Sequence, residues 1–161
     1  VLVNNASIFY PTPVADINQS DYQKIMNTNL MGPLFLSTTL SNKLTSNQGC
    51  IVNIVDIHAD RPLRNHAIYN ISKAAIAMMT KTLAKELAPN VRVNGVSPGS
   101  ILWPENEAKL TQTQKQSMLD KIALNKQGSA TDIANSVLFL AQSNYITGQI
   151  IAVDGGRTLN Q

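Results

Sequence analysis

The chain has 161 residues, of which 43% are hydrophobic and 14% charged, and its formal net charge is +3. This length supports one hydrophobic core but not two full domains, so we expect a single domain over residues 1–161. The mild charge, without a block of Lys and Arg, argues against direct nucleic-acid binding. No apolar run approaches the about 20 residues of a membrane span. No signal peptide opens the sequence, so we expect a cytoplasmic protein without a membrane partner.

Residues 1–3 form an apolar run typical of a buried strand, and a polar turn at residues 4–7 closes it. A buried strand at the start of a sequence implies strands that precede it. We therefore interpret the chain as the C-terminal part of a longer domain. Pro11 and Pro13 then forbid a helix and leave Phe9 on an extended loop.

A long amphipathic helix is predicted next, because apolar residues recur at helical spacing from Tyr22 to Leu44 and Ser20 is suited to cap its start. Pro33 lies inside this helix. Since proline has no N–H, the carbonyl of Asn29 four residues earlier loses its helical partner. We expect a kink and an Asn29 carbonyl that is free to hold a water or a side chain. A tolerated kink without a role is the alternative.

Strands and helices alternate through the rest of the chain. The predicted elements are strands over residues 50–55, 91–96 and 150–153, helices over residues 67–88 and from Thr131 to about Ala141, and a polar helical insertion over residues 105–127. Alternating helices and continuous apolar strands favour an α/β fold, in which helices cover both faces of a parallel sheet.

Ligands bind at the carboxyl ends of the strands in open α/β sheets. In this sequence those ends are residues 4–7, Asp56, residues 97–99 and residues 154–156. Polar residues and glycines gather at these four positions. The sequence therefore predicts a binding site at this edge of the sheet.

Tyr69 and Lys73 lie four residues apart in the helix that follows Asp56. Residues at this spacing share a helix face, so the Tyr69 hydroxyl and the Lys73 ammonium can reach one ligand. A nearby cation favours phenolate and is expected to lower the pKa of Tyr69 from its usual value of about 10. Such a shift suits acid–base catalysis near neutral pH. The alternative is a solvated helix face, because many helices contain this spacing by chance.

Five short motifs follow one another along the chain. They are Asn-Asn-Ala at residues 4–6, Asn29 before Gly32, Tyr69 with Lys73, Pro98 with Gly99, and Val-Asp-Gly-Gly at residues 153–156. Together they resemble the short-chain dehydrogenase/reductase family, and the resemblance covers the whole chain. It implies a Rossmann-type doubly wound parallel sheet, here without its N-terminal strands, and assembly as a homotetramer.

The same resemblance implies a role for each motif residue. Tyr69 would be the acid/base, Lys73 would orient a nicotinamide cofactor and lower the tyrosine pKa, and Asn29 would support a water in a proton relay. With Asp56, these are the candidate catalytic residues. The implied cofactor-binding residues are Asn4, Ala6, Tyr69, Lys73, Pro98, Gly99 and Ser100.

Two departures from the family pattern resemble the pteridine reductases, including the bacterial dihydromonapterin reductases. Asp56 stands where the family usually has serine, and Ser7 follows Asn-Asn-Ala where glycine is usual. This resemblance implies NADPH-dependent reduction of a C=N bond in a dihydropterin. Asp56 would bind or protonate the pterin, because a carboxylate accepts from its N–H-rich edge. The implied substrate-binding residues are Ser7, Phe9, Asp56, Tyr69 and Trp103.

Two alternatives to this function stay open. One is a carbonyl-reducing family member that acts on an oxoacyl thioester or a sugar alcohol. The other is a binding or assembly module without turnover, because the glycine-rich loop that cradles a cofactor pyrophosphate is absent. His58 and His66 lack the spacing of metal ligands, and Cys50 lies among apolar residues, so we expect no metal site.

Overall fold

The computed structural model describes residues 1–101 and 111–160 of the chain. Within these residues, parallel strands form one sheet in the order β1-β2-β3-β4. The strands are Leu2–Asn4 (β1), Cys50–Ile54 (β2), Arg92–Pro98 (β3) and Ile150–Val153 (β4). The α-helices are Gln19–Met26 (α1), Gly32–Thr39 (α2), Ser41–Ser46 (α3), Ala67–Glu86 (α4), Gln112–Leu119 (α5) and Ala130–Gln142 (α6).

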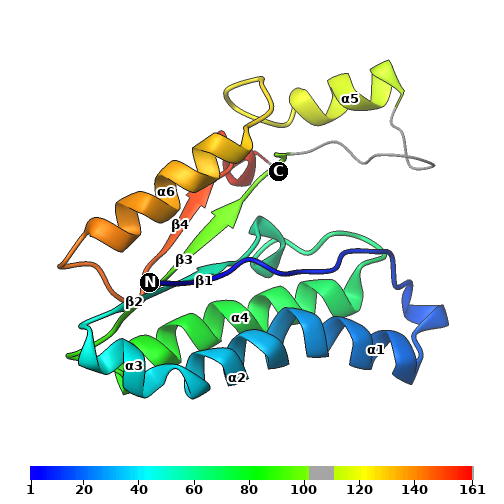
Figure 1. Ribbon diagram of the computed structural model, residues 1–161. Helices are drawn as coiled ribbons and strands as arrows, with labels where there is room; N and C mark the ends of the chain where they lie inside the picture. Colours follow the sequence, from blue (N-terminus) through cyan, green and yellow to red (C-terminus); the bar gives the residue numbers. More distant parts are fainter. Residues whose placement is uncertain (102–110, 161) are drawn as a thin grey trace.

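Helices cover both faces of this sheet (Figure 1). α1, α2 and α4 lie on one side, where α4 packs against β3, and α6 lies on the other side against β2, β3 and β4. This arrangement confirms the predicted α/β fold with a Rossmann-type, doubly wound parallel sheet. Because the strands all run in one direction, their carboxyl ends meet at one edge of the sheet.

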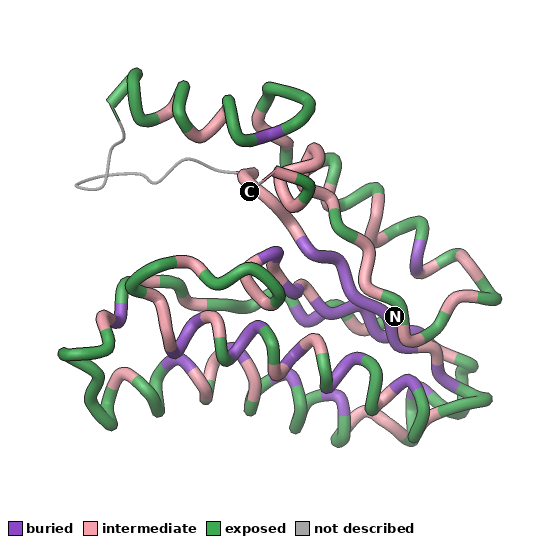
Figure 2. The backbone as a smooth tube through the Cα atoms, turned by 180° about the vertical axis from the view of Figure 1, so that it is seen from behind, coloured by how far each residue is buried: buried purple, intermediate pink, exposed green. Residues whose placement is uncertain are grey.

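The core lies on both sides of the two central strands, where buried backbone is concentrated (Figure 2). Successive residues of a strand point to opposite faces of the sheet. Ile51 therefore packs with Leu44 on the α4 side, and Val52 packs with Leu140 of α6 on the other. Cys50 belongs to the second cluster and is buried, as expected. Fully burying an aliphatic side chain such as that of Ile51 or Val52 stabilises the fold by about 1.5–3 kcal/mol.

The predicted long helix around Pro33 is interrupted by a widened turn. Asn27–Met31 form a π-helical turn between α1 and α2, in which the Gly32 N–H donates to the Asn27 carbonyl five residues back. Pro33 has no N–H to offer to a carbonyl four or five residues earlier. The π turn places this proline in the first turn of α2, where its missing N–H is tolerated. The irregularity is thus a change of helical register rather than a simple kink.

Helix starts differ from the predicted ones where another side chain makes the cap. Asn18 rather than Ser20 caps α1, because its side-chain oxygen accepts from the N–H of Asp21. Ser129 rather than Thr131 caps α6. These shifts are one or two residues long and leave the predicted order of elements unchanged.

The predicted insertion at residues 105–127 is described from residue 111 onward. α5 begins after the cap residue Thr111 and has no buried residue. Turns follow it as far as Lys126. The described part of this segment is therefore one exposed helix and a turn-rich return to the sheet, and residues 105–110 lie outside the described residues.

Candidate active site

Asp56 and Tyr69 are in direct contact near the carboxyl end of β2. Asp56 is extended and caps the short 3-10 turn Ile57–Ala59. Its Oδ1 accepts from the His58 N–H at 2.8 Å, and its Oδ2 accepts from the Tyr69 hydroxyl at 2.8 Å. One carboxylate oxygen thus fixes the group to the backbone, and the other orients the phenol.

Lys73 lies one turn after Tyr69 on α4 and is only 3% exposed. Its Nζ donates to the Ile54 carbonyl at 3.1 Å and lies 5.6 Å from the centroid of the Tyr69 ring. Burial lowers the pKa of Lys73, and the negative charge of Asp56 opposes this shift. The fold therefore brings the phenol, the ammonium and the carboxylate together at one strand end.

The pKa of Tyr69 is raised rather than lowered. Burial is the main cause, because it disfavours the charged phenolate, and both the charge and the hydrogen bond of Asp56 act in the same direction. The expected net lowering of this pKa by Lys73 is not found, because burial and Asp56 outweigh any effect of the ammonium charge. The Tyr69 hydroxyl therefore stays protonated to a higher pH than a free tyrosine hydroxyl.

The raised pKa of Tyr69 predicts how stability depends on pH. In the unfolded chain Tyr69 ionises near its usual pKa of about 10, whereas in the folded protein it stays protonated above that value. The folded state then binds more protons than the unfolded state, so its stability falls as the pH rises above about 10. We expect the urea midpoint of the wild type to decrease, relative to that of Tyr69→Phe, as the pH rises from about 9 to about 11. A difference in midpoint that stays constant over this range would contradict the raised pKa.

Asn29 holds the loop after β1 against the helices. Its side chain is 1% exposed, accepts from the Ile8 N–H at 2.8 Å and donates to the Ile8 carbonyl at 3.0 Å. It also accepts from the Ser7 hydroxyl at 3.2 Å and donates to the Ser72 hydroxyl at 3.1 Å. The Asn29 side chain thus positions the loop after β1. The predicted water relay concerns a different group, the backbone carbonyl of Asn29, to which Pro33 offers no N–H.

Asn4 is buried at the end of β1. Its amide donates to Asn53 Oδ1 at 2.8 Å and to Ser37 Oγ at 3.2 Å, and Asn53 in turn donates to Thr80 of α4. These bonds tie β1 to β2 and to the helices beneath, and the cofactor-binding prediction for Asn4 stays a prediction. Ala6, in contrast, is exposed just beyond β1 and stays a candidate.

Residues 98–100 pass unusually close to the end of β4. A Cβ atom at Gly99 would lie 2.7 Å from Asp154 Cα, which is too close for any side chain. The Gly99 N–H donates to the Val153 carbonyl at 3.1 Å. Glycine at this position therefore lets the backbone of the predicted cofactor loop approach β4.

Replacing Gly99 with alanine is expected to destabilise the fold by about 1–3 kcal/mol, because the new methyl group meets the Asp154 backbone. Urea unfolding should show a lower midpoint for Gly99→Ala than for the wild type. Equal midpoints for Gly99→Ala and the wild type would contradict the close approach.

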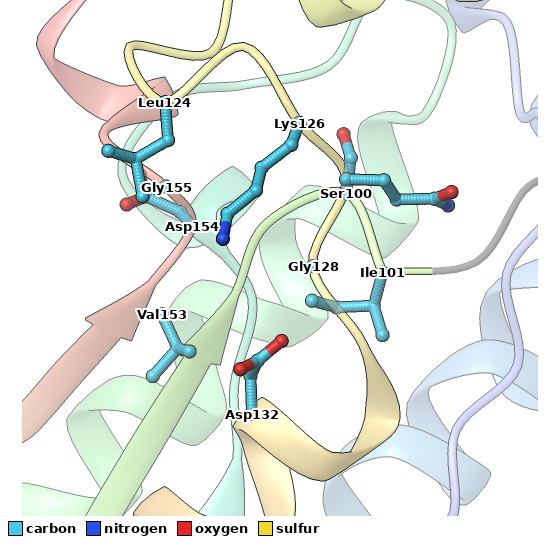
Figure 3. A pocket seen from close by; sticks show the side chains of 10 residues that line it. Ser100, Ile101, Leu124, Lys126, Gly128, Asp132, Val153, Asp154 and Gly155 are labelled. Atoms are coloured by element: carbon cyan, nitrogen blue, oxygen red, sulfur yellow. The ribbon is translucent and has the colours of Figure 1, made fainter.

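A cavity of about 200 Å³ opens beside Ser100, between the ends of β3 and β4 and the start of α6 (Figure 3). The Lys126 and Asp132 side chains extend into it from two segments of the chain. Its lining does not include Asp56 or Tyr69. The cavity therefore adjoins the predicted cofactor loop rather than the proton-transfer residues.

Phe9 packs over Tyr69 from the loop after β1. Its ring is stacked on His66, with centroids 4.6 Å apart, and meets Tyr69 edge-on at 4.8 Å. The Phe9 side chain is 53% exposed, so part of it is open to a ligand. Sequence reasoning misses His66, because its stacking partner lies in a distant loop. Trp103, the remaining predicted substrate residue, lies outside the described residues.

Both histidines near the site form a hydrogen bond to a backbone carbonyl through Nδ1. His58 is bonded to the carbonyl of Arg61 and His66 to that of Arg64, each at 2.8 Å.

Among residues 1–101 and 111–160, no group of three or more His, Cys, Asp and Glu side chains is placed to hold a metal ion. None of the helices described is long and apolar enough to cross a membrane.

Comparison with known proteins identifies the family. A family model described as enoyl-(acyl carrier protein) reductase matches residues 1–158. A 3-oxoacyl-acyl-carrier-protein reductase of Thermotoga maritima is 37% identical over 160 residues, which cover 97% of this chain and 65% of that protein. The chain belongs to the short-chain dehydrogenase/reductase family.

Other proteins similar to this short-chain dehydrogenase/reductase chain include an L-xylulose reductase of Caenorhabditis elegans, which is 34% identical over 99% of this chain and 66% of its own length. A solved structure of 4-hydroxyisoleucine dehydrogenase complexed with NADH is 30% identical, with a TM-score of 0.88 over 99% of this chain and 69% of that one. A structure of ElxO with NADP bound is 28% identical, with a TM-score of 0.85 over 99% and 67%. The chain spans about two thirds of the length of these proteins.

The names of the curated relatives bear on the branch of the short-chain dehydrogenase/reductase family. Both names denote enzymes that act on a carbonyl group, and neither is a pteridine reductase. The predicted family is confirmed. These names support the carbonyl-reducing alternative better than the pteridine reductase branch.

The strand ends of this short-chain dehydrogenase/reductase fit one end of a nicotinamide dinucleotide. Lys73 places a buried ammonium near the end of β2, and exposed Ala6 and the close-packed Gly99 lie at the ends of neighbouring strands. None of the eight glycines belongs to a G-x-G-x-x-G loop of the kind that binds a pyrophosphate. Ala6, Lys73 and Gly99 stay the candidate residues for holding the nicotinamide end of such a cofactor.

Proposed function

We propose that the protein carrying this chain reduces a C=N bond of a dihydropterin, with NADPH as the source of hydride. The observation that carries the proposal is the Asp56 carboxylate, which accepts from the Tyr69 hydroxyl at 2.8 Å where a carbonyl reductase needs a neutral donor. The resemblance to pteridine reductases favours NADPH, and the NADP bound to ElxO supports it. The NADH bound to 4-hydroxyisoleucine dehydrogenase makes NADH the alternative.

A carboxylate suits a pterin better than a ketone. When ionised it only accepts hydrogen bonds, and a pterin presents N–H groups along one edge. A ketone oxygen is itself an acceptor, so the same carboxylate repels it. Phe9 adds a partly exposed aromatic side chain beside Tyr69, against which a planar ring can stack.

Tyr69 is the proton donor in this mechanism. When bound, the cofactor supplies a hydride to the carbon of the C=N bond, and the nitrogen needs one proton to become N–H. Tyr69 is protonated at neutral pH, since the usual pKa of tyrosine is about 10 and burial and Asp56 raise the pKa of Tyr69 further. As the proton leaves, the charge of the Lys73 ammonium stabilises the phenolate. Asp56 holds the N–H edge of the substrate, and solvent restores the proton to Tyr69.

Carbonyl reduction is the second candidate, with an oxoacyl thioester or a sugar as substrate. It is favoured by the names of the two relatives, at 37% and 34% identity. In this function Tyr69 would donate to the carbonyl oxygen, and Asp56 would have to be protonated to donate as well. A binding role without turnover is the third candidate.

Turnover of the full-length protein with competing substrates separates these candidates. We expect kcat/KM for 7,8-dihydrobiopterin to exceed that for an acetoacetyl thioester and for xylulose by roughly tenfold or more. A preference for the thioester or xylulose would establish the second candidate, and substrate binding without turnover the third. The same assay with NADH in place of NADPH tests the cofactor.

We also propose that the protein forms a homotetramer through the outer surfaces of α2 and α4. Phe35 on α2 is 61% exposed, and Ile71 and Met78 on α4 are 55% and 61% exposed. Ile71 and Met78 are seven residues apart and therefore share one face of their helix. Light scattering of the full-length protein should give the mass of four chains, and a monomer would contradict this assembly.

A further inference from the structure

We propose that Thr12 is a positioning residue that fixes Tyr69 relative to Phe9. This role in substrate binding rests on the proposed function. Thr12 joins the start of the Tyr69 helix to the loop that carries Phe9. It is 3% exposed and lies between Pro11 and Pro13. A buried hydroxyl in such a loop needs a hydrogen-bond partner, and that partner is the N-terminus of α4.

The side-chain cap of α4 comes from a distant part of the chain. The residue at the start of this helix, His66, makes no side-chain capping bond, although the first N–H groups of a helix have no partner inside it. Thr12 supplies an acceptor, because its Oγ1 accepts from the Ile68 N–H at 3.3 Å. The two residues are 56 positions apart in sequence. This cap is therefore a tertiary contact and not a local one.

A backbone bond reinforces this contact. The Thr12 N–H donates to the Asn65 carbonyl at 2.6 Å, and Thr12 forms an isolated parallel bridge with His66. The prolines on either side of Thr12 restrict the backbone on both sides of it. The Thr12 hydroxyl is thus presented to α4 with little conformational freedom to lose.

The loop that carries Phe9 is consequently held at both ends. At the start of the loop Ile8 is hydrogen-bonded to Asn29, and at its end Thr12 is hydrogen-bonded to Ile68 of α4. Between these points Phe9 stacks on His66 and meets Tyr69 edge-on. Tyr69 is the third residue of α4, so a shift of the first turn moves its ring relative to Phe9. Thr12 therefore helps to fix the position of Phe9 relative to Tyr69, beside which a planar substrate would lie.

Amide hydrogen exchange tests the cap without any assay of activity. Thr12→Val removes the hydroxyl and keeps the branched shape and the backbone N–H, whereas Thr12→Ser keeps the hydroxyl. We expect the Ile68 amide to exchange about fivefold faster in Thr12→Val and at the wild-type rate in Thr12→Ser. If Thr12→Val does not fold, the wild type decides, since exchange of its Ile68 amide at the rate of an unfolded peptide would overturn the cap.

Kinetics test the positioning role. In Thr12→Val the KM for dihydropterin should rise about fivefold while the KM for NADPH stays unchanged, and Thr12→Ser should restore the wild-type value. If the role of Thr12 were purely structural, Thr12→Val would contain less active enzyme. The rate would then be lower, while the KM values for dihydropterin and for NADPH would both stay unchanged. Absence of dihydropterin turnover in the wild type would refute the proposed function, and amide exchange would still judge the cap. Equal exchange and equal KM in Thr12→Val and wild type would overturn the proposal.

Discussion

Replacing Tyr69 with phenylalanine is expected to lower kcat for the dihydropterin by roughly 10²–10⁴-fold, the usual contribution of a positioned general acid. The variant keeps the aromatic ring that Phe9 contacts and removes only the hydroxyl that donates to Asp56. Substrate and cofactor affinities should therefore change little. Steady-state kinetics with NADPH, together with nucleotide binding followed by fluorescence, measure both effects.

Tyr145→Phe is the matched control for this experiment. Tyr145 is fully exposed and lies after α6, away from the proton-transfer residues, so the same chemical change there should leave kcat unaltered. A Tyr69→Phe variant that keeps more than about a tenth of the wild-type kcat would refute the role of Tyr69 as the proton donor.

Replacing Asp56 with serine is expected to reverse the substrate preference. Loss of a charge-assisted hydrogen bond to the pterin costs about 1.5–3 kcal/mol, which corresponds to a decrease in kcat/KM of roughly 10- to 150-fold. The serine hydroxyl donates a hydrogen bond, so kcat/KM for an acetoacetyl thioester should rise. Serine is also a good cap residue, so the turn at Ile57–Ala59 should persist. The ratio of the two kcat/KM values measures the reversal.

Asp60→Ser provides the control for the change of charge. Asp60 is exposed and lies at the far end of the same turn, so its loss should leave the ratio unchanged. Asp56→Asn adds a second comparison, because it keeps the shape of the side chain and removes the negative charge. If Asp56→Ser and the wild type showed the same ratio, Asp56 would not determine the substrate class.

The order of elements and the edge of the sheet that carries the site are predictable from the sequence. Apolar runs and helical spacing are local patterns, and parallel strands bring their carboxyl ends together whatever their exact bounds. Asp56, Tyr69 and Lys73 meet there for this reason. Element bounds are less predictable, since a cap depends on which neighbouring side chain reaches a free N–H group, as Asn18 shows at α1.

The roles of other site residues depend on contacts between distant segments. Asn4 and Ala6 belong to one motif, yet the first is buried beside β2 and the second is exposed. His66 has no sequence pattern that marks it, because its partner Phe9 arrives from another loop. Likewise, the capping role of Thr12 is visible only once its loop lies against α4.

The amino-acid sequence by itself determined the α/β class and the clustering of Asp56, Tyr69 and Lys73, because both follow from local spacing, and its motifs indicated the family by resemblance. Only the tertiary structure decided how the central tyrosine ionises. Spacing along α4 suggests that Lys73 lowers the pKa of Tyr69, but burial and Asp56 raise it. The reason is physical: desolvation and the placement of hydrogen bonds depend on what covers a group, and helix spacing does not report either. The Tyr69 hydroxyl is therefore held in place by Asp56 and keeps its proton to a higher pH than a free tyrosine.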